Sequence, residues 1–347
     1  MPAWRWIIGL IISPTMDNFE VKNDFARRWE ERRKEELAFE SRQVEERFRA
    51  SRVNAGILTL DIEPTNCCNL RCRMCARTVL GYDRQERVIL GFMDFALYQR
   101  VVREAVELGA VSLRLAWYGE PLLHPQIGAM VSYAKACGLR DVGLNTNATR
   151  LNEEMTLTLL RSGLDRIVFS IDSPYPKQYE SIRVGAKFEE VLANIRRFRR
   201  LRDELGIESL LTRANLVIMK ENAHALDDYV ALLKDHVDVV ATGSFHDFQR
   251  PPAGFDADTL RAFRCPYLWL GMVVAWNGSV YVCSIDAGRQ YPVGDATRES
   301  LGSIWVGDKY AQMRDLHRAS RWCESPICAR CNLVELFLEH YDMPSPG

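Results

Sequence analysis

The sequence predicts an α/β protein with an open parallel sheet and a small cysteine-containing domain at its C-terminal end. Strand-like segments alternate with amphipathic helices from residue 57 to residue 241, and the alternation stops at a proline- and glycine-containing linker, Gln249–Gly254. Six strand–helix units are too few for a closed eight-stranded barrel, but they suit a partial (β/α)6 barrel. We therefore predict an N-terminal helical extension over 1–54, the partial barrel over 55–248 and the small domain over 249–347.

The predicted strands are short, mostly apolar runs with β-branched side chains, and the helices between them carry an apolar face. Asp94 is placed to cap the first helix, and Gly109 is placed to end it. The six strands are predicted over residues 57–62, 112–117, 142–145, 166–171, 214–219 and 237–241. The helices that separate them are predicted over residues 97–108, 127–137, 153–161, 188–205 and 223–234, and two further strand-like runs beyond the linker over 272–275 and 280–282.

The composition is that of a globular protein, since the 347 residues are 47% hydrophobic and 26% charged. Lysine and arginine total 45, and aspartate and glutamate total 46. The chain therefore lacks the excess of basic residues that would indicate a nucleic-acid partner. The early apolar run Trp6–Ile12 is much shorter than the roughly 20 residues of a membrane-spanning helix, so no membrane association is predicted. Residues 19–50 are highly charged and predict an exposed helix, and Met16 is an alternative start to Met1.

Three cysteines follow the first predicted strand with Cx3Cx2C spacing: Cys68, Cys72 and Cys75. Three thiolates this close can hold three irons of a [4Fe–4S] cube and leave the fourth iron open to another ligand. A structural zinc site normally has four protein ligands, and no obvious fourth ligand lies nearby in the sequence. A fourth zinc ligand from elsewhere and three unconnected buried thiols remain alternatives at this point.

Polar residues end the next three predicted strands. Tyr118–Pro121 follows the second strand, Asn145–Asn147 the third and Ser170–Ser173 the fourth. In parallel β/α barrels the functional groups gather at the carboxyl ends of the strands. We therefore expect these groups and the cysteine loop to converge on one rim of the barrel.

The cysteine loop, the Gly-Glu-Pro turn and the strand pattern together resemble the radical S-adenosylmethionine (SAM) superfamily, over roughly residues 55–245 by motif placement. The resemblance implies a partial (β/α)6 radical SAM barrel whose [4Fe–4S] cluster binds SAM at its open iron. It also implies reductive cleavage of SAM to a 5′-deoxyadenosyl radical, which abstracts hydrogen from a substrate.

The resemblance assigns roles to individual residues. Cys68, Cys72 and Cys75 match the cluster ligands. Glu120 matches the carboxylate that accepts from the SAM ammonium group, and Gly119 matches a position that leaves room for the methionine part of SAM.

Further polar residues are assigned to the same cofactor pocket. Ser170 matches a polar position near the SAM ribose or carboxylate, and Asn145 and Asn147 are candidates for the same pocket, although asparagine at a strand end is often only a turn former. Arg183 is a candidate partner for a carboxylate of SAM or substrate, with a surface arginine as the alternative. The sequence departs from the family pattern at Tyr118, where a glycine is usual, and at Met74, where an aromatic residue is usual.

A second cysteine group lies beyond the linker: Cys265, Cys283, Cys328 and Cys331. Four thiolates can close a site around either zinc or a [4Fe–4S] cluster. The pattern resembles the SPASM/Twitch extension of radical SAM enzymes, and its gaps of 18, 45 and 3 residues resemble those of 2-deoxy-scyllo-inosamine dehydrogenase. The resemblance implies the shorter Twitch form, with one auxiliary [4Fe–4S] cluster. For the remaining cysteines, Cys67, Cys137 and Cys323, ordinary packing is the preferred interpretation.

The resemblance predicts a dehydrogenase-type oxidoreductase that acts on a small sugar, nucleoside or aminocyclitol, with the auxiliary cluster as electron acceptor. Arg250 in the linker is predicted to bind the substrate or assist its deprotonation. A flavodoxin or ferredoxin is the expected reductant, and the cytoplasm is the expected location because such clusters need a reducing interior. The alternatives are a peptide-modifying maturase, a sugar epimerase with Cys323 as its hydrogen donor, a sugar decarboxylase, and a non-catalytic metal-binding protein.

Overall fold

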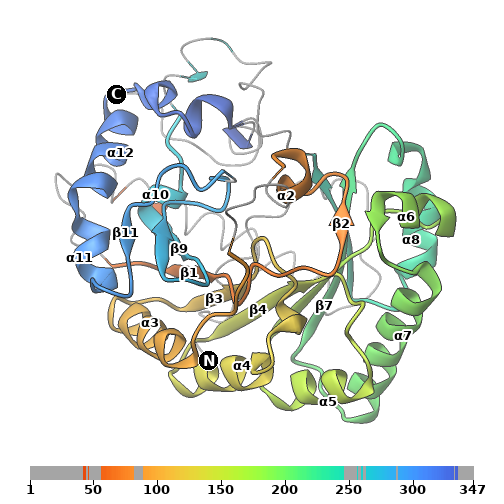
Figure 1. Ribbon diagram of the computed structural model, residues 1–347. Coiled ribbons are helices and arrows are strands. Elements are labelled where there is room, and N and C mark those ends of the chain that lie inside the picture. The colour runs from red at the N-terminus through yellow and green to blue at the C-terminus, as the bar shows by residue number, and fades with distance from the viewer. Residues whose placement is uncertain are drawn as a thin grey trace.

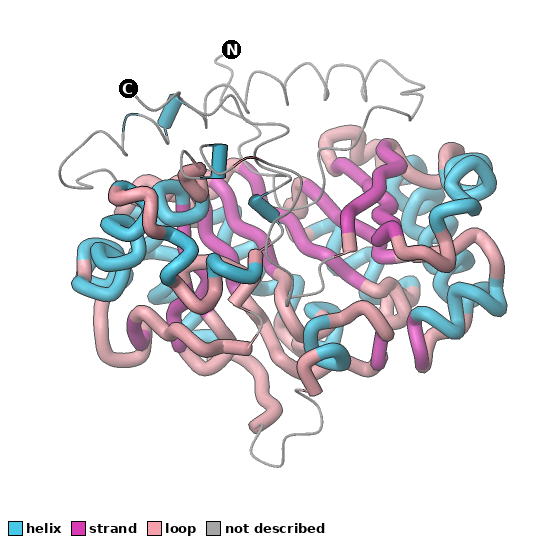
Figure 2. Tube along the Cα trace, turned by 90° about the horizontal axis from the view of Figure 1, so that it is seen from above, coloured by secondary structure: helices cyan, strands magenta, loops and turns pink. Residues whose placement is uncertain are grey.

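The computed structural model describes residues 42–43, 46, 56–81, 89–245, 256, 259–260, 263–286, 288–331 and 333–334. The predicted N-terminal helix over residues 19–50 therefore falls almost entirely outside the described residues. Within the described part, one continuous nine-stranded sheet is flanked by helices (Figures 1 and 2). None of the helices in these ranges combines the length and the apolar composition needed to cross a membrane.

Six parallel strands form the barrel, and every neighbouring pair among them is parallel. The predicted α/β fold is therefore confirmed, with the predicted strands in place. Their bounds are β1 (Thr59–Ile62), β3 (Ser112–Leu115), β4 (Asp141–Thr146), β5 (Arg166–Ser170), β7 (Leu211–Ile218) and β8 (Val239–Ser244).

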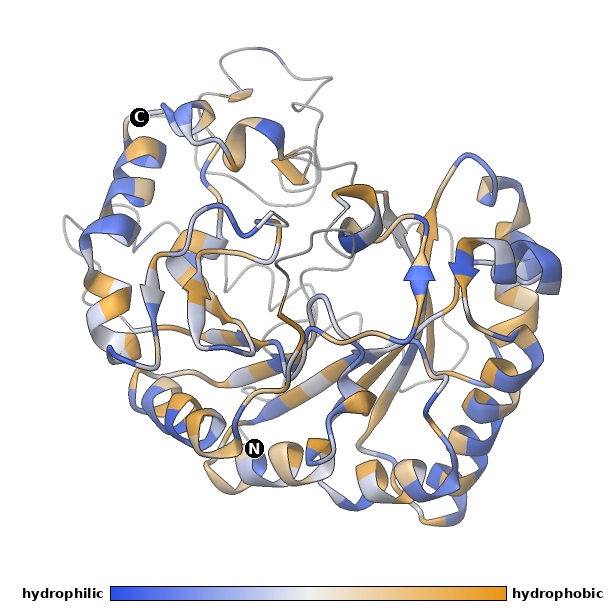
Figure 3. Cartoon of the chain, viewed as in Figure 1, coloured by the Kyte–Doolittle hydropathy of each residue, from blue (hydrophilic) through white to orange (hydrophobic). Residues whose placement is uncertain are grey.

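The helices cover the outer side of the sheet, and Figure 3 shows that each carries both apolar and polar residues. Asp94 caps the first of them by accepting a hydrogen bond from Leu97 N at 2.9 Å, and Gly109 follows its end with a φ of +93°, as the sequence predicts. Their bounds are α3 (Phe95–Glu107), α4 (Ile127–Ala136), α5 (Glu153–Arg161), α6 (Pro176–Ile182), α7 (Phe188–Glu204) and α8 (Leu226–Leu233), the last preceded by a 3-10 turn, η3 (Ala223–Ala225).

The C-terminal part adds three strands to the open edge of the barrel sheet. Strand β9 (Gly271–Val274) pairs in parallel with β1, and β10 (Ser279–Tyr281) and β11 (Gly294–Asp295) continue the sheet in antiparallel fashion. A Cβ on Gly271 would lie only 2.1 Å from Thr59 Oγ1, so glycine allows this close pairing. An open barrel leaves the N–H and C=O groups at one edge of β1 unpaired, and β9 satisfies them.

The two parts also share one hydrophobic core. Ile57 and Leu113 of the barrel belong to the same buried cluster as Trp269 and Trp305 of the C-terminal part. The predicted domain boundaries remain a prediction, but the sheet and the core are continuous across them. The remaining C-terminal elements are α10 (Tyr267–Leu270), α11 (Leu301–Val306), α12 (Asp308–Arg318), η4 (Trp322–Glu324) and η5 (Cys328–Arg330).

Candidate iron–sulfur and cofactor sites

The first cysteine loop follows β1 and folds back on itself. It contains a two-residue strand, β2 (Arg71–Cys72), and a short helix, α2 (Ala76–Val79), with Cys75 at its N-terminus. Cys75 N donates to Cys72 O at 3.1 Å, which brings these two thiols together. Burial, together with the nearby charges of Glu120, Cys72 and Cys75, raises the pKa of the Cys68 thiol to about 12. The loop therefore gathers three thiols in one poorly hydrated place.

These three thiols match in number the protein ligands of a [4Fe–4S] cube that keeps one iron open. No three or more His, Cys, Asp or Glu side chains of the described residues converge tightly enough to hold one metal ion. A cube presents its irons at separate corners, so its ligands stand further apart than the four ligands of a zinc ion. None of the ten cysteines, all of which are described, forms a disulfide bond. The raised thiol pKa makes loss of the proton costlier, and a coordinated metal offsets this cost because it deprotonates the thiol outright.

Glu120 lies buried in the loop that follows β3, at the N-cap of a 3-10 turn, η2 (Pro121–Leu123), and it links this loop to the end of β4. Its carboxylate accepts hydrogen bonds from Thr146 Oγ1 at 2.6 Å, Asn147 N at 2.7 Å and Leu122 N at 3.1 Å. Burial raises the pKa of Glu120, while these bonds oppose that effect. A carboxylate offers about four acceptor positions, so one remains for a further donor. The ammonium of SAM, predicted for this residue, is such a donor.

Position 119 requires glycine for a structural reason that the sequence does not reveal. A Cβ at this position would lie 1.9 Å from Thr65 O and 2.7 Å from Cys67 O. The next residue, Glu120, donates from its backbone N to Cys67 O at 2.8 Å. Only glycine thus allows the end of β3 to lie against the start of the cysteine loop, and the predicted contact with SAM remains a proposal.

The other predicted strand-end residues lie on the same rim. Asn145 is half-buried on β4, and Ser170 is half-buried at the last position of β5. Asn147 donates from Nδ2 to Asn69 Oδ1 at 3.1 Å, and Asn69 in turn donates to Thr149 Oγ1 at 2.7 Å. Asn147 therefore fixes the cysteine loop to the end of β4, while the predicted cofactor contacts of Asn145 and Ser170 remain proposals.

Arg183 is not the surface arginine that the sequence left as an alternative. It lies buried at the start of β6 (Arg183–Val184), and its Nε donates to Asp172 Oδ2 at 2.5 Å. Its Nη1 lies 3.7 Å from Cys72 Sγ. Burial alone would lower the pKa of Arg183, but the negative charges of Asp172 and Cys72 raise it. A charged guanidinium therefore lies beside the first cysteine loop.

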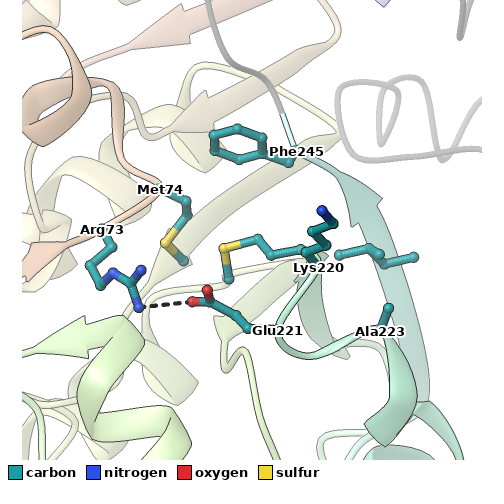
Figure 4. A pocket seen from close by; sticks show the side chains of 8 residues that line it. Arg73, Met74, Lys220, Glu221, Ala223 and Phe245 are labelled. Carbon is teal, nitrogen blue, oxygen red and sulfur yellow. Dashed lines mark hydrogen bonds and ion pairs between the residues drawn. The ribbon is translucent and has the colours of Figure 1, made fainter.

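A cavity of about 520 Å³ opens between the cysteine loop and the ends of the last two barrel strands (Figure 4). An ion pair between Arg73 Nη1 and Glu221 Oε1, 3.0 Å long, crosses one side of it. Sequence reasoning missed this cavity, although the strand-end rule that located Glu120 applies equally to the fifth and sixth strands. Its lining includes Arg73 and Met74 from the cysteine loop, Ile218, Met219 and Glu221 at the end of β7, and Phe245 after β8.

The second cysteine group also comes together. The charges of Cys283, Cys328 and Cys331 act on Cys265, so the four thiols lie within electrostatic reach of one another. Burial raises the pKa of all three thiols for which a shift is resolved, to about 11 for Cys328 and well above the usual value for Cys265 and Cys283. Four thiols within electrostatic reach, one buried and three partly buried, fit a site in which every metal position has a protein ligand.

The remaining candidates are placed as follows. Arg250 lies outside the described residues, so its predicted role is untested. Cys137 packs partly buried against the hydrophobic core, Cys67 is half-buried and Cys323 is exposed on η4.

Two family models match the chain over ranges that contain the two cysteine groups. A family model described as Radical SAM superfamily matches residues 62–233, and one described as an iron–sulfur cluster-binding domain, SPASM, matches residues 265–332. The tungsten-containing aldehyde ferredoxin oxidoreductase cofactor-modifying protein of Pyrococcus furiosus is 25% identical over 79% of this chain and 87% of its own length. A GTP 3′,8-cyclase of Desulforamulus reducens is 30% identical, but over only 52% of this chain and 53% of its own length.

Two solved structures share the fold. BtrN in complex with AdoMet and 2-DOIA has a TM-score of 0.53 at 20% identity, over 82% of this chain and 97% of BtrN. Streptococcus suis SuiB bound to S-adenosylmethionine has a TM-score of 0.60 at 16% identity, over 93% of this chain and 83% of SuiB. At these identities the likeness establishes the fold alone.

Proposed function

Because the chain belongs to the radical SAM superfamily and carries a C-terminal SPASM domain, we propose that it is a dehydrogenase-type radical SAM oxidoreductase of a small hydroxylated or amino-bearing molecule. The two domains imply a SAM-binding [4Fe–4S] cluster and an auxiliary iron–sulfur cluster. The proposed substrate class is a sugar, nucleoside or aminocyclitol. A flavodoxin or ferredoxin is the proposed reductant and the cytoplasm the proposed location, because oxygen-sensitive clusters need a reducing interior.

The cysteine groups would hold the two clusters: Cys68, Cys72 and Cys75 the first, and Cys265, Cys283, Cys328 and Cys331 the second. When bound, the first cluster supplies the electron that cleaves SAM to a 5′-deoxyadenosyl radical, and the second supplies an acceptor for the electron that leaves the substrate.

The protein's own residues would bind and orient SAM beside the first loop. Glu120 has one acceptor position left for the ammonium group, and it is held rigidly by Thr146 and the Asn147 backbone. Ser170, Asn145 and Arg183 are proposed to contact the ribose or the carboxylate.

The cavity at the ends of β7 and β8 is proposed to hold the nucleoside part of SAM. Its volume of about 520 Å³ lies within the usual range of small-molecule sites. Met74, Met219 and Phe245 offer thioether and aromatic surfaces, which pack well against a flat heterocycle. This packing would also keep water away from the neighbouring thiols.

One observation carries the dehydrogenase proposal: four thiols, one buried and three partly buried, lie at a second site that is tied to the rim of the barrel. Trp117, just after β3, donates from Nε1 to Ser284 O at 2.8 Å, directly beside Cys283. A site closed by four thiolates cannot bind substrate through an open metal position, so electron transfer is the chemistry that it supports.

The proposal is tested by reconstituting the full chain anaerobically with iron and sulfide and adding dithionite and SAM. We expect 5′-deoxyadenosine, and with 2-deoxy-scyllo-inosamine as the first probe we expect the corresponding ketone. A reconstituted protein that forms no 5′-deoxyadenosine contradicts the radical SAM assignment. Formation of 5′-deoxyadenosine together with an epimerised or decarboxylated product from a sugar-acid probe contradicts the dehydrogenase assignment only.

A peptide-modifying function is the second candidate, and one surface feature favours it. Ile89, Leu90 and Phe92 are exposed on an extended segment beside the cysteine loop, where Asn66 Nδ2 donates to Ile89 O at 2.8 Å. Exposed apolar residues beside an active site suit a peptide better than a sugar. SuiB has also been solved bound to a precursor peptide, SuiA. If Leu90→Asp abolishes the reaction on a peptide probe but leaves 5′-deoxyadenosine formation intact, this candidate replaces the first.

A further inference from the structure

Arg183 and Cys72 face each other across a two-stranded antiparallel sheet. Strand β2 pairs with β6, and in this register Cys72 lies directly opposite Arg183. The guanidinium Nη1 donates to Cys72 Sγ at 3.7 Å, a separation consistent with a bond to the large sulfur atom. A buried positive charge therefore contacts one of the three proposed cluster ligands directly.

The guanidinium is fixed from its other side. Its Nε donates to Asp172 Oδ2 at 2.5 Å, and Asp172 Oδ1 accepts from Val217 N at 2.7 Å. Asn222 Nδ2 also donates to the backbone oxygen of Asp172 at 2.9 Å. Asp172 is fully buried and Arg183 is 8% exposed, so neither side chain has room to turn away. The carboxylate thus holds the arginine with its positive end toward the sulfur.

At the second cysteine site, the leading electrostatic influences on Cys265 and Cys283 come from other thiols and, for Cys283, from Asp286. Within the described part of the chain, no arginine or lysine is among these leading influences. The arginine contact is therefore a feature of the first site and does not follow merely from burying cysteines in this fold.

We propose that Arg183 is a positioning residue that raises the reduction potential of the first cluster through its N–H bond to Cys72 Sγ. This inference rests on the proposed function, since it takes Cys72 as a cluster ligand. Reduction adds one electron, which comes from the external reductant, and so makes the cluster more negative. A nearby cation and an N–H donor to a ligand sulfur both stabilise that form.

The test is a potentiometric titration of the reconstituted full chain, followed by electron paramagnetic resonance in the absence of SAM. Leaving SAM out separates the contact with Cys72 from any contact between Arg183 and the SAM carboxylate. The signal of the first cluster is identified by its loss in Cys72→Ala. In Arg183→Met we expect the ratio of reduced to oxidised cluster at a fixed potential to fall about tenfold, a shift of about 59 mV toward negative values.

A matched control removes a comparable buried arginine far from the cysteines. Arg202 is buried and donates from Nη2 to Asp238 Oδ1 at 3.0 Å. Asp238 also accepts from Thr212 N at the start of β7, so this pair lies at the opposite end of the strands from the cysteine loop. Arg202→Met should lower the stability of the protein but leave the potential of the first cluster unchanged.

The outcomes separate the inference from the proposed function. An intact four-iron signal at an unchanged potential in Arg183→Met overturns the inference, and a wild-type chain that assembles no cluster at this loop overturns the proposed function. If Arg183→Met fails to hold a cluster, Arg183→Lys and Arg183→Gln decide. Potentials equal to that of the wild type in both variants overturn the inference, and lower potentials, with the neutral glutamine variant lowest, support it.

Discussion

The two cysteine sites use the same ligand chemistry in different surroundings. The first gathers Cys68, Cys72 and Cys75 from one loop at the ends of the barrel strands, beside a cation and a cavity of about 520 Å³. The second gathers four thiols from three separate segments, and three of them, Cys265, Cys328 and Cys331, pack against a cluster of Phe263, Trp322 and Val334. The ligands alone therefore do not decide the role of a cluster. Three thiolates with an adjoining cavity suit cofactor binding, and four thiolates that close every metal position suit electron transfer.

A cation and two aromatic rings connect the two sites. Arg289 lies over the rings of Trp117 and Tyr118, at 4.7 Å and 5.0 Å, and its Nη2 donates to both carboxylate oxygens of Glu63 at 2.6 Å. Glu63 directly follows β1, on the side of the first cysteine loop, whereas Arg289 follows Cys283. The two sites therefore share one packed junction, and changes to it should affect both.

Removing one cysteine ligand from each site in turn is the most severe test of the proposed difference between the two sites. Cys72→Ala should lower 5′-deoxyadenosine formation more than 100-fold, because loss of a ligand costs more than the 10- to 100-fold typical of residues behind the ligands. Cys283→Ala should keep 5′-deoxyadenosine formation but abolish the oxidised product. Both products are measured by chromatography after anaerobic reconstitution, with Cys137→Ala as the control. Full dehydrogenation by Cys283→Ala would contradict the difference in roles.

The junction between the sites is tested by Arg289→Met. Removing one partner of a buried ion pair costs about 3–5 kcal/mol, because the other charge is left unpaired. Burial already raises the pKa of Glu63, and Arg289 opposes that effect, so the variant should raise this pKa further. A carboxyl group whose pKa is raised by folding loses stability as the pH rises from its unfolded value toward its folded value.

The loss caused by Arg289→Met should therefore be smaller near pH 5 than at pH 8. Chemical denaturation at the two pH values measures it. The double variant Arg289→Met with Glu63→Met removes both charges and should recover most of the loss. An equal loss at both pH values would show that the cost is packing and not charge.

The sequence predicts the barrel well because its signals are local. Alternation, capping and glycine stops depend on neighbouring residues, and they locate the cap Asp94 and all six barrel strands. The start of β7 is three residues earlier than predicted, at Leu211, because Thr212 and Arg213 look polar in sequence. In the structure Thr212 is fully buried and bonds to Asp238 with both its N and its hydroxyl, each at 2.8 Å.

The features that the sequence does not predict depend on distant partners. Nothing near Gly271 indicates that its strand pairs with β1, more than 200 residues earlier in the chain. Arginine is usually found at the surface, and only the partner Asp172 and the opposing Cys72 explain why Arg183 is buried. The same holds for Gly119, whose missing side chain makes room for the backbone of Thr65.

The variant Glu120→Gln tests whether SAM binds at the first site only, because it keeps the shape of the side chain and removes its charge. A hydrogen bond to a charged group is worth about 1.5–3 kcal/mol, which corresponds to roughly a 10- to 100-fold rise in the dissociation constant of SAM. Calorimetric titration of the reconstituted protein with SAM measures this change. The spectrum of the auxiliary cluster should not change, and an unaltered affinity would remove Glu120 from the proposed SAM site.

The smallest expected effect comes from Trp117→Phe, which keeps an aromatic ring in the junction and removes one donor. Trp117 Nε1 loses its bond to Ser284 O, which is worth about 0.5–1.5 kcal/mol. Hydrogen exchange should therefore quicken at residues 284–286, beside the second site, and change less at residues 68–75. Trp322→Phe is the matched control, because Trp322 Nε1 donates to Leu260 O at 2.7 Å, a bond of the same kind in the cluster that packs against Cys265, Cys328 and Cys331. If both variants quicken exchange at 284–286 equally, the effect is general softening of the C-terminal part. If only Trp117→Phe does so, the indole ties the loop of the second site to the rim of the barrel.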